Sequence, residues 1–255
     1  MSDLVRVERD APRPGSWRLV LDDPSHANAL SPRLVAQLAA SLHAAFESDA
    51  RAIVFDSSGD RFCGGFDLAD IEGLTDAQLR ERFAAIEDLL ETIRRAPALT
   101  IAVVRGAAIG AGADLVASCD YRIGASNARL AFPGSRFGVV LGTRHLAAVV
   151  GGQLAREILV EGRKLDASAA VECGLLSSLC AEDKIAARID EILRGAEAAD
   201  VETMRAILRL TRDAPSERDR TELVRSVSRD GLAERMRQHA RRANEERVAR
   251  RTSRR

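Results

Sequence analysis

The spacing of hydrophobic and polar residues changes several times along the chain, and each change predicts a different element. Near the N-terminus, "LVRVERD" and "SWRLVLDD" have strand-like patterns, and the "APRPG" stretch that interrupts them is typical of a hairpin turn. Apolar residues at helical spacing follow Ser31-Pro32 and continue to Phe46. Serine is a favourable N-cap and proline suits the first helical position, so we expect a helix to begin there.

The alternation of strands and helices continues to about residue 180. Buried strands are predicted at "RAIVFDS" and "ALTIAVVRG", and between them Thr75 and Gln78 form a capping box for an amphipathic helix that ends before Pro97. Next, "DYRIGASNARLAF" predicts two short strands, "GVVLGT" leads into a helix, Asp166 caps "ASAAVECG", and "LLSSLC" is a short strand. From about Ala181 the pattern is helical. This order predicts an α/β core followed by a helical region.

Composition excludes some classes of partner. The chain has 255 residues, and 38 basic side chains balance 38 acidic ones, so no overall field recruits nucleic acid or an anionic membrane surface. No apolar run approaches the length of a membrane span, and "MSDLVRVERD" lacks the apolar region of a signal peptide. We therefore expect a cytoplasmic protein without a nucleic-acid or membrane partner, and we interpret "ARRANEERVARRTSRR" as a solvated helix end.

Cysteine and histidine spacing does not indicate a metal site. The cysteines at 63, 119, 173 and 180 lack Cys-x-x-Cys spacing and lie among apolar or small residues, which favours reduced, mostly buried thiols. The four histidines show no paired ligand spacing. We expect no metal.

Two stretches share one pattern: "RFCGGFDLADI" at 61–71 and "GAAIGAGADL" at 106–115. In each, an apolar strand leads into small residues, which permit close approach to the backbone, and then into a helical pattern. The first turn of a helix exposes unpaired N–H groups, so two such ends facing each other would form an oxyanion hole. Glycine-rich turns also hold phosphates or simply let backbones pack, and the spacing leaves these alternatives open.

A resemblance sharpens this interpretation. In order, "NAL" at 28–30, "RFCGGFDL", "GAAIGAGADLVASCDYRI" and "EGRKLDASAAVECGLLSSL" resemble the crotonase superfamily, also called the enoyl-CoA hydratase/isomerase family, over about residues 4–190. The resemblance implies an α/β spiral of repeated ββα units over residues 1–190. It also implies a C-terminal helical region over residues 191–255 that completes a homotrimer or a dimer of trimers (a hexamer). Finally, it implies an enzyme of lipid metabolism, a lyase or an isomerase, that acts on a coenzyme A thioester without a cofactor.

The resemblance also assigns site residues. It implies that the backbone N–H groups of Phe66 and Ala111 bind the thioester oxygen. It also implies contacts with the acyl-CoA at His26, Ala27, Arg61, Asp67, Leu68, Ala69 and Gly110. Two of these have open alternatives, because His26 also fits a surface turn and Arg61 a solvated side chain.

The family pattern breaks at its acid and base positions. Hydratases of the family use two glutamates; this chain has Asp114 at the first position and Gly134, after a proline, at the second. Isomerase branches place an aspartate at the first position, so we interpret Asp114 as a proton carrier, although a carboxylate there could also complement the helix dipole. The segment "GVVLGTRHL" is shorter than usual. Arg136, Arg144 and His145 lie near it, and we assign none of them a catalytic role.

The sequence therefore predicts an acyl-CoA enzyme that stabilises a thioester enolate and is closer to an isomerase than to a hydratase. A non-catalytic acyl-CoA-binding protein and a C–C bond hydrolase or decarboxylase remain alternatives. The helix over 75–94 and the segment over 133–142 are expected to line the acyl pocket. The C-terminal helices are expected to bury apolar residues in a closed ring, namely Ile185, Ile189, Ile192, Leu193, Met204, Ile207, Leu208 and Leu210.

Overall fold

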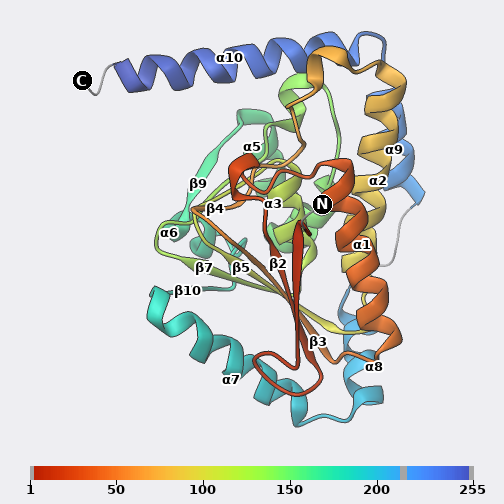
Figure 1. Cartoon of the computed structure of the whole chain (residues 1–255), viewed down its shortest axis with the longest axis vertical. Coiled ribbons are helices and arrows are strands. Elements are labelled where there is room, and N and C mark those ends of the chain that lie inside the picture. The colour runs from red at the N-terminus through yellow and green to blue at the C-terminus, as the bar shows by residue number, and fades with distance from the viewer. Residues whose placement is uncertain (1–2, 213–216, 253–255) are drawn as a thin grey trace.

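Two sheets form the centre of the molecule (Figure 1). The structure is a computed structural model and describes residues 3–212 and 217–252. Within these residues the larger sheet has the strand order β1 (Val5–Arg9), β2 (Ser16–Leu21), β3 (Ala52–Ser57), β5 (Leu99–Val104), β7 (Tyr121–Ala125) and β10 (Ser178–Cys180). The smaller sheet has the order β4 (Arg61–Cys63), β6 (Ala107–Ile109), β8 (Arg129–Ala131) and β9 (Lys164–Asp166).

The chain winds as a spiral in which successive turns add one strand to each sheet and then a helix. Thus β3 and β4 precede α2, β5 and β6 precede α3, and β7 and β8 precede α4. Strands of successive turns pair in parallel, whereas β1–β2 and β8–β9 are antiparallel. The predicted spiral of ββα units is confirmed.

The helices are α1 (Pro32–Glu47), α2 (Asp76–Arg94), α3 (Ala111–Ser118), α4 (Thr143–Val150), α5 (Gly152–Glu161), α6 (Ala167–Glu172), α7 (Ile185–Glu197), α8 (Val201–Thr211), α9 (Glu217–Val227) and α10 (Leu232–Thr252).

Local sequence signals account for several helix boundaries. The Ser31 side chain caps α1, Thr75 and Gln78 form the predicted capping box of α2, and the Asp166 side chain caps α6. The helix predicted after "GVVLGT" is two helices. They divide at Gly151, whose φ of +81° lies outside the right-handed helical region.

We expected the apolar residues of the C-terminal helices to be buried between subunits. For most of these residues that expectation is wrong. α7 and α8 pack on one face of the larger sheet, where Val54, Ile101 and Val103 form an apolar surface. Within the single chain this packing buries Ile185, Ile189, Ile192, Leu193 and Leu208. Met204 is partly buried, whereas Ile207 is 46% and Leu210 86% exposed.

The last helix, α10, is held against the body of the protein near its N-terminal end. Asp76 accepts hydrogen bonds from the backbone N–H groups of Gly231 (3.1 Å) and Ala233 (2.8 Å). Arg237 donates to the backbone carbonyls of Ile71 (3.3 Å) and Leu74 (3.1 Å). These contacts place the first turns of α10 over the 71–76 region, while its C-terminal end projects away from the sheets (Figure 1).

The thiols are less uniformly buried than predicted. Cys63 and Cys119 are buried, but Cys173 and Cys180 are only half-buried because they lie at a helix end and on an edge strand. All four are free cysteines. No helix in the described part of the chain is long and apolar enough to cross a bilayer.

Candidate active site

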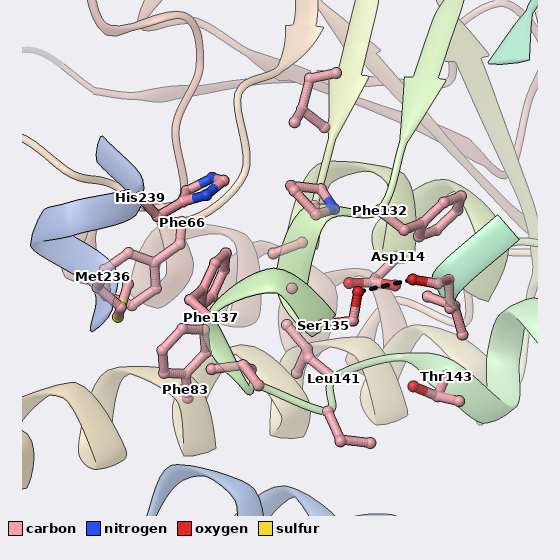
Figure 2. Close-up of a pocket in the computed structure, with 18 of the residues that line it drawn as sticks. Phe66, Phe83, Asp114, Phe132, Ser135, Phe137, Leu141, Thr143, Met236 and His239 are labelled. Carbon is pink, nitrogen blue, oxygen red and sulfur yellow. Dashed lines mark hydrogen bonds between the residues drawn. The ribbon is translucent and has the colours of Figure 1, made fainter. Parts of the chain in front are cut away.

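A cavity of about 460 Å³ lies among α2, α3, α10 and the 3-10 turn over Pro133–Phe137 (Figure 2). The two segments expected to line the acyl pocket, α2 and residues 133–142, both contribute to its wall, through Phe83 and several residues between 133 and 141. The protein has seven phenylalanines. Four of them line the cavity: Phe66, Phe83, Phe132 and Phe137. A lining this apolar suits an apolar ligand group.

Ala111 lines this cavity, and its backbone N–H has no acceptor among the described residues. It is the first residue of α3, where an amide has no partner within the helix. The amides of Ala113 (2.8 Å) and Asp114 (2.9 Å) donate to the Gly110 carbonyl instead. Among the described residues, the Ala111 amide donates to no acceptor.

Phe66 does not begin a helix, so the prediction of two facing helix ends is wrong for the first stretch. Phe66 forms a parallel bridge with Leu30, whose amide donates to the Gly65 carbonyl at 2.7 Å. This pairing holds the backbone extended, and only a 3-10 turn follows, at Ile71–Gly73. The Phe66 amide nevertheless has no acceptor within the described part of the chain, and Phe66 lines the cavity.

The glycines between these donors serve close backbone packing. A Cβ at Gly65 would lie 2.3 Å from the Ile109 carbonyl oxygen and 3.4 Å from the Ala111 nitrogen, so the two glycine-rich stretches touch. A Cβ at Gly112 would lie 2.6 Å from the Cys63 carbonyl oxygen. The packing alternative is thus correct for these two glycines. The same packing brings the Ala111 amide next to the residue that precedes Phe66.

Asp114 also lines the cavity, one helical turn after Ala111 (Figure 2). It is only 5% exposed. Burial, and then the charge of the nearby buried Glu87 on α2, raise the pKa of Asp114 well above its ordinary value. Burial therefore favours the neutral carboxyl group. A neutral group carries a transferable proton and does not complement a helix dipole as a charge would.

The predicted coenzyme-binding residues divide into two groups. Leu68 and Gly110 line the cavity, whereas the others do not: His26, Ala27, Arg61, Asp67 and Ala69. The second group includes a loop next to the site, because the Ala27 carbonyl accepts a hydrogen bond from the Gly64 amide at 2.8 Å. His26 is exposed, and its pKa is raised mainly by Asp23, with a smaller contribution from Asp67.

Three further polar residues near the shortened segment do not line the cavity: Arg136, Arg144 and His145. His145 is in the first turn of α4, as expected of a helix N-terminal residue, but it is buried. Its Nδ1 lies 2.6 Å from Ser118 Oγ on α3, and its Nε2 lies 3.6 Å from a carboxylate oxygen of Glu91 on α2. We interpret His145 as a structural link between these helices.

Sequence reasoning missed two cavity residues that come from α10. Met236 and His239, three residues apart on one face of that helix, line the cavity. Figure 2 shows His239 projecting from α10 toward the cavity. The sequence does show a histidine in the C-terminal helical region, but the local pattern of residues does not indicate that this helix packs against the cavity. No cluster of three or more metal-ligating side chains occurs in residues 3–212 and 217–252.

Comparison with known proteins agrees with this geometry. The model of the family described as enoyl-CoA hydratase/isomerase matches residues 17–245. A solved structure from Bordetella parapertussis that carries an enoyl-CoA hydratase/isomerase name superposes with a TM-score of 0.90 at 35% identity and covers 94% of this chain and 99% of that one.

Two curated relatives extend the comparison. The enoyl-CoA isomerase/hydratase fer4 of Mycosarcoma maydis is 30% identical over 190 residues, which are 69% of each chain. The mouse enoyl-CoA hydratase domain-containing protein 3, described as mitochondrial, is 33% identical over 71% of this chain, but the match spans only 61% of the mouse protein. Taken with the family match over residues 17–245, these similarities show that the chain belongs to the enoyl-CoA hydratase/isomerase family, within the crotonase superfamily.

Proposed function

We propose that the protein is an acyl-CoA enzyme that moves a carbon–carbon double bond by way of a thioester enolate. The observation that carries this proposal is that one apolar cavity is lined by a buried carboxyl group and by two residues whose backbone amides have no acceptor in the described part of the chain. The amides belong to Phe66 and Ala111 and the carboxyl group to Asp114. Fixed donors in a dry site stabilise a developing oxyanion strongly, and removing one typically costs about 10²–10³ in rate.

The proposed reaction converts a β,γ-unsaturated acyl-CoA into its α,β-unsaturated isomer. Loss of a proton from Cα places negative charge on the thioester oxygen, where the Phe66 and Ala111 amides hold it. Return of a proton at Cγ completes the shift of the double bond. Asp114 carries a proton in this exchange, and no cofactor is required.

Hydration is the less favoured reaction because the residue at the second acid/base position has no acidic or basic side chain. Gly134 lines the cavity but has no side chain with which to position water. Each well-placed acid or base contributes about 10²–10⁴-fold in rate, so its absence is expected to leave hydration weak.

Proton exchange tests the proposal. The protein is incubated in deuterated water with a panel of 2-enoyl-, 3-enoyl- and saturated acyl-CoA thioesters of different chain lengths, and mass spectrometry and NMR locate any deuterium. Isomerisation of a 3-enoyl-CoA, with deuterium at Cα or Cγ, is the expected result. Tight binding of thioesters without any exchange or turnover would refute the proposed enzymatic function and favour a second candidate, a protein that only binds acyl-CoA.

That second candidate is a non-catalytic acyl-CoA-binding protein. Gly134 favours it, because one of the two acid/base positions of the family is lost. Asp114 opposes it, because burying a carboxyl group in an apolar cavity costs stability. A protein that only binds the thioester would have no need of that group.

We also propose that the protein acts in lipid metabolism in the cytoplasm. The acyl-CoA substrate class supports the first part, and the balanced net charge is compatible with the second. One relative is described as mitochondrial, so cell fractionation with an antibody to this chain is the appropriate test.

A further inference from the structure

The proposed isomerisation leaves one chemical role without a group that suits it. The reaction begins with removal of a proton from Cα, which requires a base. Burial and the charge of Glu87 favour the protonated form of Asp114, and a protonated carboxyl group donates a proton better than it accepts one. Gly134 supplies neither function. The base must come from another residue that lines the cavity.

His239 lines the same cavity as Phe66, Ala111 and Asp114. Apart from Asp114 and Arg156, it is the only side chain among the described cavity residues that titrates as an acid or a base. An arginine stays protonated at any pH that proteins tolerate, so Arg156 does not serve as a base. That leaves His239 as the group that can accept a proton.

The position of His239 is fixed by its surroundings. Its ring packs at a tilt against Phe137, with 4.9 Å between the ring centroids. Arg235, one turn earlier on α10, donates to the Phe137 carbonyl at 3.1 Å. Neither ring nitrogen of His239 forms a hydrogen bond with the described residues, so both are available to a ligand or to water.

The charges around His239 favour the neutral imidazole. Partial burial lowers its pKa, and the positive charges of Arg136 on the 3-10 turn and Arg242 on α10 lower it further. Only Glu246, also on α10, acts in the opposite direction. Two groups whose environments favour opposite protonation states, an acid that keeps its proton and a base that stays neutral, form a suitable acid–base pair.

We propose that His239 is the general base that removes the Cα proton, while Asp114 is the acid that protonates Cγ. This assignment rests on the proposed function. A ring nitrogen of His239 takes the proton, and the C–H electron pair forms the Cα–carbonyl double bond while the carbonyl π electrons move to the oxygen. Those electrons then return to re-form the carbonyl group, and the new double bond lies between Cα and Cβ. The electrons of the old Cβ–Cγ double bond take the Asp114 proton at Cγ. Half-buried His239 returns its proton to water, and the Asp114 carboxylate takes a proton from water after product release.

The experiment compares His239→Gln with the wild-type protein and with Gln238→Ala, an exposed change at the next position of α10. Turnover of a 3-enoyl-CoA, deuterium exchange at Cα and the pH profile of kcat/KM are measured for each. In His239→Gln we expect turnover and exchange to fall by about 10²–10⁴. The wild-type profile should lose activity as falling pH protonates His239, and His239→Gln should lack that limb.

Rescue separates chemistry from packing. His239→Ala opens a space in which added imidazole should restore turnover, whereas no rescue is expected in His239→Phe, which keeps a ring against Phe137. Thioester binding and circular dichroism establish that each variant is folded. A folded His239→Gln protein that retains turnover and Cα exchange within about twofold of wild type overturns the assignment and leaves the proposed function intact. A wild-type protein that neither exchanges nor isomerises any thioester of the panel overturns both.

Discussion

The backbone of Gly142 lies directly against the carboxyl group of Asp114: a Cβ at position 142 would be 2.3 Å from Asp114 Oδ1 and 2.4 Å from its Cγ. Gly142 is the N-cap of α4 and has a φ of +60°, so the loop turns sharply at this point. This contact helps to exclude solvent from Asp114. The shortened segment before α4 therefore shapes the environment of the proposed proton carrier without adding a polar group of its own.

Gly142→Ala is expected to displace Asp114. The methyl group collides with the carboxyl group, and a residue other than glycine in the left-handed region adds a strain of about 1–2 kcal/mol. Gly174→Ala is a matched control, because Gly174 has a φ of +77° but its nearest neighbour would be 3.8 Å from the new Cβ. Chemical denaturation and 3-enoyl-CoA turnover are measured for both. We expect both variants to lose stability and only Gly142→Ala to lose activity; equal activities would show that the contact is unimportant.

Asp114→Asn tests the protonation state of the carboxyl group. The pKa of Asp114 is raised on folding, so at low pH both states hold the proton and burial carries no ionisation penalty. As pH rises above the pKa of the unfolded state, only the unfolded chain ionises freely, and native stability falls until pH passes the folded-state pKa. Asparagine cannot ionise. We therefore expect Asp114→Asn to gain stability over wild type as pH rises, while turnover falls by about 10²–10⁴. A stability difference that does not depend on pH would contradict the raised pKa.

Local signals in the sequence were sufficient for the alternation of strands and helices, whereas the family resemblance implied the spiral and the site residues. Helix caps such as Ser31 and Asp166 act within a few residues, so their effect can be predicted from their neighbours. The free amide of Ala111 follows from its place at the start of α3. The extended backbone at Phe66 could not be predicted in this way, because it depends on pairing with Leu30, which belongs to another part of the chain.

The residues that sequence reasoning placed wrongly or missed depend on long-range packing. His145 is buried because Ser118 and Glu91, from two other helices, provide polar partners for its ring. His239 reaches the cavity because Asp76 anchors the start of α10 far away in the sequence. Helical periodicity identifies an apolar face but does not say whether that face meets the same chain or a partner.

Ala111→Pro removes one proposed oxyanion donor. Proline suits the first position of a helix, and the Ala111 amide forms no hydrogen bond with the described residues, so the fold should survive. Val201→Pro is a matched control at the first position of α8, away from the cavity. Turnover or proton exchange is expected to fall by about 10²–10³ in Ala111→Pro alone. Circular dichroism comes first, and a folded, fully active Ala111→Pro protein would refute the role of this amide.

Gly134→Glu tests why hydration should be weak. A Cβ at Gly134 would be 3.2 Å from the Val139 carbonyl oxygen, a tight contact that a small shift relieves, and no positive φ opposes a side chain. We expect the wild-type protein to hydrate a short 2-enoyl-CoA barely or not at all, and Gly134→Glu to raise that rate. Gly134→Gln supplies the same shape without the carboxylate and should not. Robust hydration by the wild-type protein would show that another group activates water.

Assembly is tested at the apolar surface that remains exposed on α8. Leu210 is 86% and Ile207 46% exposed, and a closed ring of subunits would cover such side chains. We propose a trimer or a dimer of trimers, and light scattering at micromolar concentration should report one of these masses. Leu210→Asp should shift the protein toward monomers, because association would bury a charge. Val224→Asp on α9, where the side chain is 48% exposed, is the control and should leave the mass unchanged. A wild-type protein that stays monomeric would end the proposed assembly.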